Sequence, residues 1–245
     1  MSVRIEGRNP VFEALKNHRV LKVWIAQEIK TDQKIQEIMD LCHDSGVPIE
    51  STTLTELDRI SETRHHQGTI AYLKPPEPQN LKGILEHEGR EKCLLLVDHI
   101  QDPHNLGAIL RTAESTGVDC VVVPKRSSVG LTATVHRVSM GGSIYVPVLR
   151  TSLYSTLKIL RMEGIRVIGV DPMGSKAYFS ENLTGSVAFI LGGEDKGISQ
   201  GLLRKCDGIV NIPMLGRLKS LNLSVAAAIV LYERVRQQTE KTQQP

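Results

Sequence analysis

Asn105 and Arg111 could together orient an oxygen atom and stabilise negative charge that develops on it. Their loop follows the apolar run Cys93–Val97 and opens a helical pattern. A helix N-terminus offers free backbone N–H groups and a positive dipole end, which suit a phosphate. Six residues are less than two helical turns, so both side chains could face one crevice. Alternatively, Asn105 only caps the helix and Arg111 is a solvated surface residue.

A second polar loop begins where the apolar run Val187–Leu191 ends. Gly192 and Gly193 permit close approach of a ligand to the backbone, and Glu194 follows them directly. The glycine spacing matches neither GxGxxG nor a P-loop, so a nucleotide-binding oxidoreductase is poorly supported. The alternative is a plain turn from a strand into a helix that Ser199 caps.

A third loop connects a strand-like segment ending at Ile212 to a long Ala-rich helical pattern. Ser220 and Asn222 have short polar side chains that form caps and local backbone hydrogen bonds. A capped helix packed on the core accounts for part of this pattern, but not for the polar density of the loop. The loop is therefore a third candidate for chemistry.

The elements around these loops predict an α/β fold with a parallel sheet and helices on both faces. From residue 91 onward, apolar runs alternate with helical patterns. We expect strands at 93–97, 119–123, 145–149, 166–170, 187–191 and 208–212, and helices at 105–116, 131–140, 152–163 and 224–238. Ligands bind beyond the carboxyl ends of such strands, where the three loops would meet. The polar tail 237–245 should be frayed.

Residues 1–73 predict a smaller α/β unit. Its strands should span 20–26, 47–50 and 69–73, with helices at 10–17, 33–45 and 53–60. Asn9 and Asp32 are expected to cap the first two helices, and Gly46 to end the second. Pro75, Pro76 and Pro78 then predict a linker over residues 74–90. A second domain would occupy 91–245.

Composition limits the classes of function. The 245 residues have a net charge of +3, but residues 1–75 carry ten Lys/Arg against eleven Asp/Glu, whereas residues 91–245 carry eighteen against thirteen. A mildly basic C-terminal part suits a polyanion, although ordinary surface charge would look the same. The cysteines form no CxxC pair, and Cys93 and Cys120 should be buried thiols. With no apolar span, signal core or metal-ligand spacing, we expect a cytoplasmic protein without metal or membrane contact.

Together the loops resemble the three motifs of the TrmH/SpoU branch of the SPOUT RNA methyltransferases. The first motif is similar at Asn105, Gly107, Arg111, Thr112 and Ala113, and the second at Gly192, Glu194, Gly197 and Ser199. The third is similar at Ile212, Pro213, Met214, Gly216, Ser220, Leu221, Asn222, Ser224, Val225 and Ala226. Residues 1–73 resemble the L30e-like RNA-binding domain of the RlmB-type subgroup. The segments 7–11 and 66–68 carry this resemblance. The resemblance covers nearly the whole chain.

The resemblance implies methylation of a ribose 2′-hydroxyl by S-adenosylmethionine, with a guanosine of 23S ribosomal RNA as the substrate. It also implies a C-terminal trefoil knot and a homodimer whose active site lies near the subunit interface. By analogy, Gly192, Ile212 and Leu221 should contact the cofactor, mainly through backbone atoms.

The same resemblance assigns hydroxyl activation to Arg111. Because a guanidinium stays protonated in proteins, we expect Arg111 to stabilise the developing alkoxide and hold the adjacent phosphate instead. Glu194 or an RNA phosphate would then take the proton. Asn105 should orient Arg111 or the ribose, while Ser220 and Asn222 order the cofactor loop and contact the substrate.

Three alternatives stay open. The same chemistry could act on transfer RNA, or on the ribosomal site of resistance methyltransferases. The fold could also serve a non-catalytic RNA-binding factor in ribosome assembly. The polar residues of the three motifs are all present, which argues against that last hypothesis.

Overall fold

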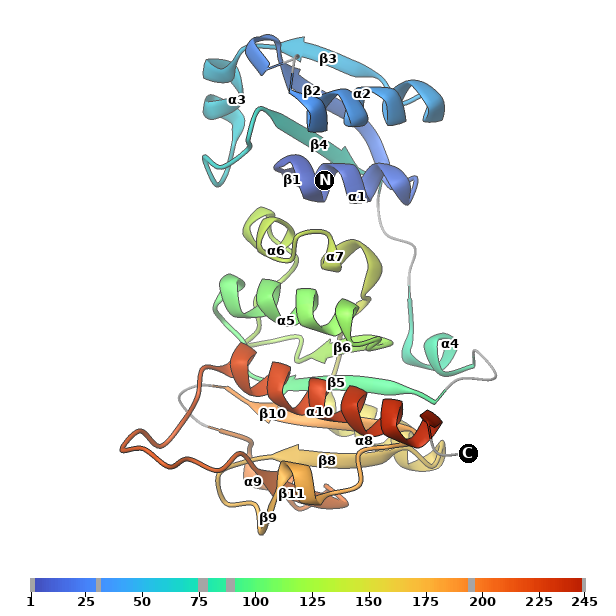
Figure 1. The fold of residues 1–245 in the computed structure, drawn as a ribbon, viewed down its shortest axis with the longest axis vertical. Helices are drawn as coiled ribbons and strands as arrows, with labels where there is room; N and C mark the ends of the chain where they lie inside the picture. Colours follow the sequence, from blue (N-terminus) through green and yellow to red (C-terminus); the bar gives the residue numbers. More distant parts are fainter. Residues whose placement is uncertain (1–2, 30–31, 75–78, 87–90, 194–196, 244–245) are drawn as a thin grey trace. The chain divides into compact units, whose positions relative to one another are not determined.

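The computed structural model in Figure 1 describes residues 3–29, 32–74, 79–86, 91–193 and 197–243. The chain divides into two compact units. The first comprises Met1–Pro78 and Gly130–Tyr145, and the second Gln79–Val129 and Val146–Pro245. Each unit is described by itself. No helix among the described residues is both long enough and apolar enough to cross a membrane.

The first unit contains a four-stranded sheet in the order β1-β4-β2-β3. Its strands are β1 (Arg4–Glu6), β2 (Val20–Ala26), β3 (Ile49–Thr52) and β4 (Thr69–Leu73). Its helices are α1 (Arg8–Lys16), α2 (Gln33–Ser45), α3 (Leu54–Ile60), α6 (Ala133–Val138) and α7 (Gly142–Tyr145), with a 3-10 turn, η1 (Gln27–Ile29). Strand β4 is antiparallel to both β1 and β2, whereas β3 runs parallel to β2.

Local signals predicted several of these elements to the residue. Strands β2 and β4 and helix α2 have the expected bounds, and the Asp32 side chain accepts hydrogen bonds from the backbone N–H groups of Lys34 and Ile35. Gly46 ends α2 in the left-handed conformation. The predicted cap of the first helix is wrong: α1 begins at Arg8 after Gly7, so Asn9 lies inside it.

The second unit is built on a seven-stranded sheet in the order β7-β6-β5-β10-β8-β11-β9. Every pairing in it is parallel, which confirms the predicted fold class. Its strands are β5 (Cys93–Asp98), β6 (Cys120–Val123), β7 (Val148–Arg150), β8 (Arg166–Val170), β9 (Lys176–Ala177), β10 (Val187–Gly192) and β11 (Gly208–Asn211). Its helices are α4 (Leu81–Leu85), α5 (Pro103–Ser115), α8 (Leu153–Met162), α9 (Gln200–Leu203) and α10 (Leu223–Gln243), with a 3-10 turn, η2 (Tyr178–Ser180).

Helices cover both faces of this sheet. Leu94, Leu96 and Ile190 pack in one core cluster with side chains of α8 and α9. Alternate residues of a strand point to opposite faces, so Leu95 and Phe189 face the other side. There α5 and α10 lie side by side in Figure 1. The parallel strands therefore bring their carboxyl ends to one edge of the sheet.

Three predicted features differ from the structure. Helix α5 begins at Pro103 and is capped by Asp102, so Asn105 is a buried residue within the helix and not its cap. Helix α4 lies in the segment predicted as a linker, of which residues 75–78 and 87–90 lie outside the described part of the chain. Helices α6 and α7 group with the first unit by contact.

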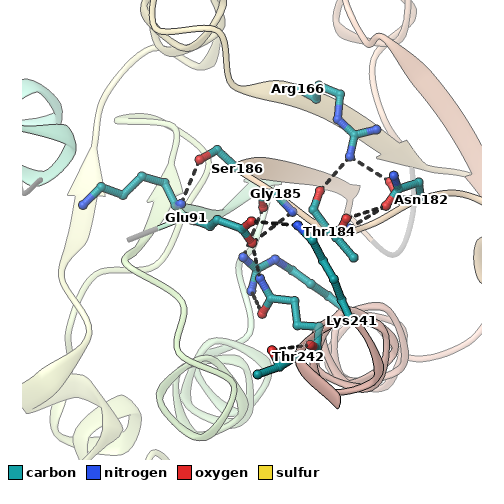
Figure 2. A network of polar contacts seen from close by, with 11 residues as sticks. Glu91, Arg166, Asn182, Thr184, Gly185, Ser186, Lys241 and Thr242 are labelled. Carbon is teal, nitrogen blue, oxygen red and sulfur yellow. Dashed lines mark hydrogen bonds and ion pairs between the residues drawn. The ribbon is translucent and has the colours of Figure 1, made fainter. Parts of the chain in front are cut away.

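The C-terminal tail is helical, so the prediction that it frays from residue 237 is wrong. Gln237 accepts a hydrogen bond from the backbone N–H of Leu183 at 2.8 Å and donates one to the carbonyl oxygen of Glu181 at 3.1 Å. Figure 2 shows Lys241 reaching Glu91, with 3.3 Å between Nζ and Oε1. Glu91 also accepts from the backbone N–H of Gly185. These contacts with distant residues extend α10 to Gln243.

Two cysteines behave as expected from their apolar neighbours. Cys93 and Cys120 are both buried. Burial, with a smaller contribution from Asp119, raises the pKa of the Cys120 thiol to about 12. This thiol is therefore protonated at neutral pH and unreactive.

Candidate functional site

A cavity of about 230 Å³ opens at the carboxyl edge of β8, β10 and β11. This volume is slightly below the range of roughly 300–1,000 Å³ that is typical of small-molecule sites in proteins. Its described lining consists of Val170, Asp171, Pro172, Leu191, Gly192, Gly193, Gly197, Ile212, Met214, Lys219, Ser220, Leu221, Leu223 and Ala226. The walls thus combine apolar side chains, glycine backbone and two groups of opposite charge.

Glycines shape the turn beside this cavity. A Cβ atom on Gly192 would lie 1.9 Å from the carbonyl carbon of Gly197, and one on Gly193 would lie 2.5 Å from the backbone oxygen of His99. Gly197 has a φ of 63° and donates its N–H to the oxygen of Gly193 at 3.0 Å. No side chain fits between these backbones, so a bound molecule would meet main-chain atoms there.

Asp98 ties the same turn to the neighbouring strand. Its side chain is 4% exposed and accepts a hydrogen bond from the backbone N–H of Ser199 at 3.1 Å. Strand β5 pairs with β10 from Cys93 to Asp98, so the two strand ends are held together. The rigid sheet therefore positions the glycine turn.

Four of the residues predicted from sequence meet in the cavity. Gly192, Ile212, Ser220 and Leu221 all line it, although the last three lie some twenty residues or more beyond the first. The carboxyl ends of β10 and β11 bring the two loops together, because β8 alone separates these strands. The second and third loops thus form one site.

Asn105 and Asn222 form a second group beside it. Asn222 Nδ2 donates to Asn105 Oδ1 at 2.9 Å, and Asn222 Oδ1 accepts from the backbone N–H of Ser224. Asn222 directly precedes α10, and its neighbours Leu221 and Leu223 line the cavity. This contact links the first loop to the third.

Arg111 and Glu194 join neither group in the described structure. Arg111 is exposed on α5, and its guanidinium forms no hydrogen bond or ion pair within the described ranges. It does not line the cavity. Glu194 lies outside the described residues, together with 195 and 196.

Sequence reasoning missed two charged residues of the cavity, Asp171 and Lys219. Asp171 directly follows β8, as Asp98 terminates β5, so a polar residue at the end of an apolar run was an available signal. Lys219 stands in a loop of mixed composition and carries no comparable signal. Among the described residues, no group of three or more His, Cys, Asp or Glu side chains could hold a metal ion.

Comparison with known families covers almost the whole chain. Residues 92–232 match the SpoU rRNA Methylase family, and residues 4–79 match the family model for RNA 2′-O ribose methyltransferase substrate binding. A protein of Staphylococcus saprophyticus named as a TrmH family tRNA/rRNA methyltransferase is 37% identical over 234 residues, covering 94% of this chain and 93% of its own. YacO of Bacillus subtilis, named in the same way, is 36% identical and covers 93% and 92%.

Solved structures share the fold. The crystal structure of an RNA 2′-O ribose methyltransferase superposes with a TM-score of 0.82 at 28% identity, covering 97% of this chain and 89% of the other. AviRb from Streptomyces viridochromogenes, a SpoU methyltransferase solved in complex with AdoMet, superposes with a TM-score of 0.81 at 24% identity, covering 97% and 91%. At that identity the second likeness concerns the fold alone.

Proposed function

Because this chain belongs to the SpoU rRNA methylase family of RNA methyltransferases, we propose that it methylates the 2′-hydroxyl of a guanosine ribose in 23S ribosomal RNA. The methyl donor is S-adenosylmethionine. The observation that carries the proposal is the cavity, which joins Gly192, Ile212 and Leu221 at the carboxyl edge of the parallel sheet.

The cavity fits the chemistry of this donor. Apolar walls from Ile212, Leu221 and Leu223 suit a nucleoside base, and the glycine backbone at Gly192 supplies polar atoms without side chains. Lys219 provides a positive charge for the carboxylate of the amino-acid portion. When bound, S-adenosylmethionine supplies a methyl group that is already activated by the positive charge on its sulfur.

Arg111 would act on the RNA and not on the donor. Its exposed guanidinium has no partner in the described part of the chain, so it can hold a phosphate and stabilise negative charge on the ribose oxygen. It stays protonated and cannot itself accept the proton. In this proposal Glu194 or an RNA phosphate accepts it.

Asn105, Ser220 and Asn222 would position these groups. The hydrogen bond between the two asparagines holds the start of α10 against α5, which fixes the loop that presents Ser220 and Leu221 to the cavity. Ser220 is exposed at the cavity wall and is proposed to contact the substrate. The predicted trefoil knot around this loop stays a prediction.

We assign choice of the RNA to residues 1–73, a linker role to 74–90 and catalysis to 91–245. The match of residues 4–79 to a substrate-binding model supports the first assignment. Three basic side chains of this unit that could bind RNA already have carboxylate partners: Arg4 pairs with Glu62, Arg8 with Asp32 and Lys16 with Glu13. Arg19 has no carboxylate partner among the described residues and is then the better candidate for binding phosphate.

We also infer a homodimer. Val225 and Tyr232 are exposed on α10 by 46% and 53%, and a spacing of seven residues puts them on one helix face. A second copy of the chain would cover this apolar face of α10, the helix that packs against the Arg111-bearing α5. Sedimentation velocity should show a dimer, and the substitution Tyr232→Glu should shift it toward the monomer.

Nucleoside mass spectrometry of ribosomal and transfer RNA, with and without the gene, tests the function. Loss of one 2′-O-methylguanosine from 23S RNA is the expected result. Loss from transfer RNA alone would move the activity to that substrate. Unchanged methylation of both RNAs would overturn the proposal in favour of a non-catalytic assembly factor.

A further inference from the structure

Asp171 presents a carboxylate to the cavity, and no cationic side chain among the described residues pairs with it. The residue is 9% exposed and lines the cavity directly after β8. Its Oδ1 accepts the backbone N–H of Met173 at 2.9 Å. For Oδ2, the described residues provide neither a hydrogen bond nor an ion pair. One oxygen is therefore used by the protein and the other is not.

The backbone holds Asp171 firmly in this place. Its N–H donates to the carbonyl oxygen of Val210 at 2.9 Å, and its own carbonyl oxygen accepts from Gly174 at the same distance. A Cβ built on Gly197 would lie 3.6 Å from Oδ2, so this oxygen is next to the glycine turn of the cavity. The side chain belongs to the cavity wall and cannot swing into solvent without breaking the Met173 contact.

An ionised carboxylate that is nine-tenths buried is costly unless a cation or several donors compensate it. Lys219 is the cationic residue among the described lining, and it makes no ion pair with Asp171. A positively charged molecule bound in the cavity would lie beside the unused Oδ2 and compensate this carboxylate.

We propose that Asp171 recognises the positive charge of the methyl donor, at its sulfonium or its α-ammonium group. This inference rests on the proposed function, because it takes the cavity as the donor site. During the reaction the ribose oxygen bonds to the methyl carbon, the carbon–sulfur bond breaks with its electron pair going to sulfur, and the hydroxyl proton passes to Glu194 or an RNA phosphate. The sulfur thereby loses its charge, so a carboxylate beside it favours the donor over the product.

Calorimetric binding to the purified full-length protein tests this without any turnover. Three ligands separate the sources of charge: S-adenosylmethionine, its neutral-sulfur product S-adenosylhomocysteine, and 5′-methylthioadenosine, which lacks the amino-acid portion. Asp171→Asn removes the charge and keeps an oxygen for the Met173 N–H. A hydrogen-bonded charge of this kind accounts for roughly tenfold to a hundredfold in affinity.

The expected result is a loss of that size for S-adenosylmethionine and no change for 5′-methylthioadenosine. If S-adenosylhomocysteine keeps its affinity, the contact is to the sulfonium; if it loses as much, the contact is to the ammonium. Equal loss for all three ligands, or loss for none, overturns the inference, since the carboxylate would then serve the nucleoside, the loop or nothing in the cavity.

Asp207→Asn is the matched control. Asp207 accepts the backbone N–H of Val167 at 2.8 Å at the opposite edge of the sheet, so its loss changes net charge equally and should leave all three affinities unchanged. Asp171→Ser, whose hydroxyl can also accept from Met173, should reproduce the ligand pattern if the Asn variant does not fold. Wild-type protein that binds none of the ligands would overturn the proposed function as well, whereas normal wild-type binding with an unchanged variant overturns only the role of Asp171.

Discussion

Asn222 Nδ2 donates a hydrogen bond to Asn105 Oδ1 at 2.9 Å, which joins two residues that are 117 positions apart in the chain. The same Asn222 side chain accepts from the backbone N–H and the hydroxyl of Ser224, so it also caps α10. One amide thus fastens the start of α10 to α5, at the point where the chain leaves the cavity. The first and third polar loops depend on each other through this contact.

Replacing either asparagine by alanine should lower the free energy of unfolding by about 1–2 kcal/mol, because each loses a partly buried hydrogen bond. Asn222→Asp keeps the oxygen that caps α10 but loses the donor to Asn105, so it separates the two roles. A double-mutant cycle from urea unfolding should give a coupling energy of about 1 kcal/mol. Additive effects of the two alanines would show that the contact carries no stability.

The Arg111→Lys variant should still methylate RNA at a measurable rate. Its kcat should fall by a larger factor than its KM changes. Lysine keeps the positive charge but not the planar fork that holds phosphate and oxygen together. Single-turnover and steady-state rates on the RNA identified by mass spectrometry provide the measurement. A variant that works at the wild-type rate would exclude Arg111 from the chemical step, both as the group that stabilises the alkoxide and as the group that activates the hydroxyl.

Gly192→Ala should abolish binding of the methyl donor and destabilise the second unit, because its Cβ would overlap the backbone of Gly197 at 1.9 Å. Gly83→Ala in α4 is the control, since its Cβ meets nothing closer than Asn80 Oδ1 at 3.6 Å. Alanine there should raise helix stability slightly. Thermal unfolding and calorimetry measure both effects, and a Gly192→Ala protein with normal binding would contradict the assignment of this turn to the site.

Glu6 should make the first unit sensitive to acid. It is fully buried, and burial alone raises its pKa, but hydrogen bonds from the Thr63 hydroxyl, the Glu62 N–H and the Ser61 hydroxyl outweigh burial and lower the pKa below its ordinary value of 4.5. A carboxyl whose pKa is lowered by folding stabilises the protein above about pH 4.5, and this contribution is lost as the pH falls through the lowered pKa.

Glu6→Gln should therefore lower the free energy of unfolding by about 1–3 kcal/mol at pH 7. Below pH 4.5 the free energy of unfolding of this variant should depend less steeply on pH than that of the wild type. Urea unfolding from pH 3 to 7 provides the measurement. Glu50→Gln is a control, because Glu50 is exposed and its pKa is lowered chiefly by a hydrogen bond from Lys22. A parallel shift of the Glu6→Gln curve at every pH would show that the carboxylate charge is not involved.

Deleting residues 237–245 should lower the midpoint of thermal unfolding by several degrees. The deletion removes the contacts of Gln237 with Leu183 and Glu181 and the contact of Lys241 with Glu91 (Figure 2). Two partly buried hydrogen bonds and one exposed ion pair correspond to about 1–3 kcal/mol. Deleting 244–245 alone is the matched control, and equal midpoints for the two deletions would show that the last turns of α10 contribute nothing.

The elements predicted most accurately are those whose signals lie within a few residues. Asp32 and Gly46 bracket α2 by interactions of their own neighbours, and the apolar run of β8 has the predicted bounds. Strand β1 was missed because three residues carry no periodicity; it exists through pairing with β4, more than sixty residues away. The last turns of α10 were missed for a similar reason, since polar residues look frayed until Glu91 and Glu181 are placed beside them.

The sequence by itself determined the alternation of strands and helices, the parallel sheet and the three polar loops, because apolar periodicity and cap residues act locally. Only the tertiary structure decided which loop residues share a cavity, that Asn222 contacts Asn105, and that Asp171 faces the same space as Gly192. Those facts depend on strand order: β10 lies between β5 and β8, and β11 beyond β8, an order that no local signal encodes. Long-range packing therefore assembles the site from residues that local sequence patterns identify only as candidates.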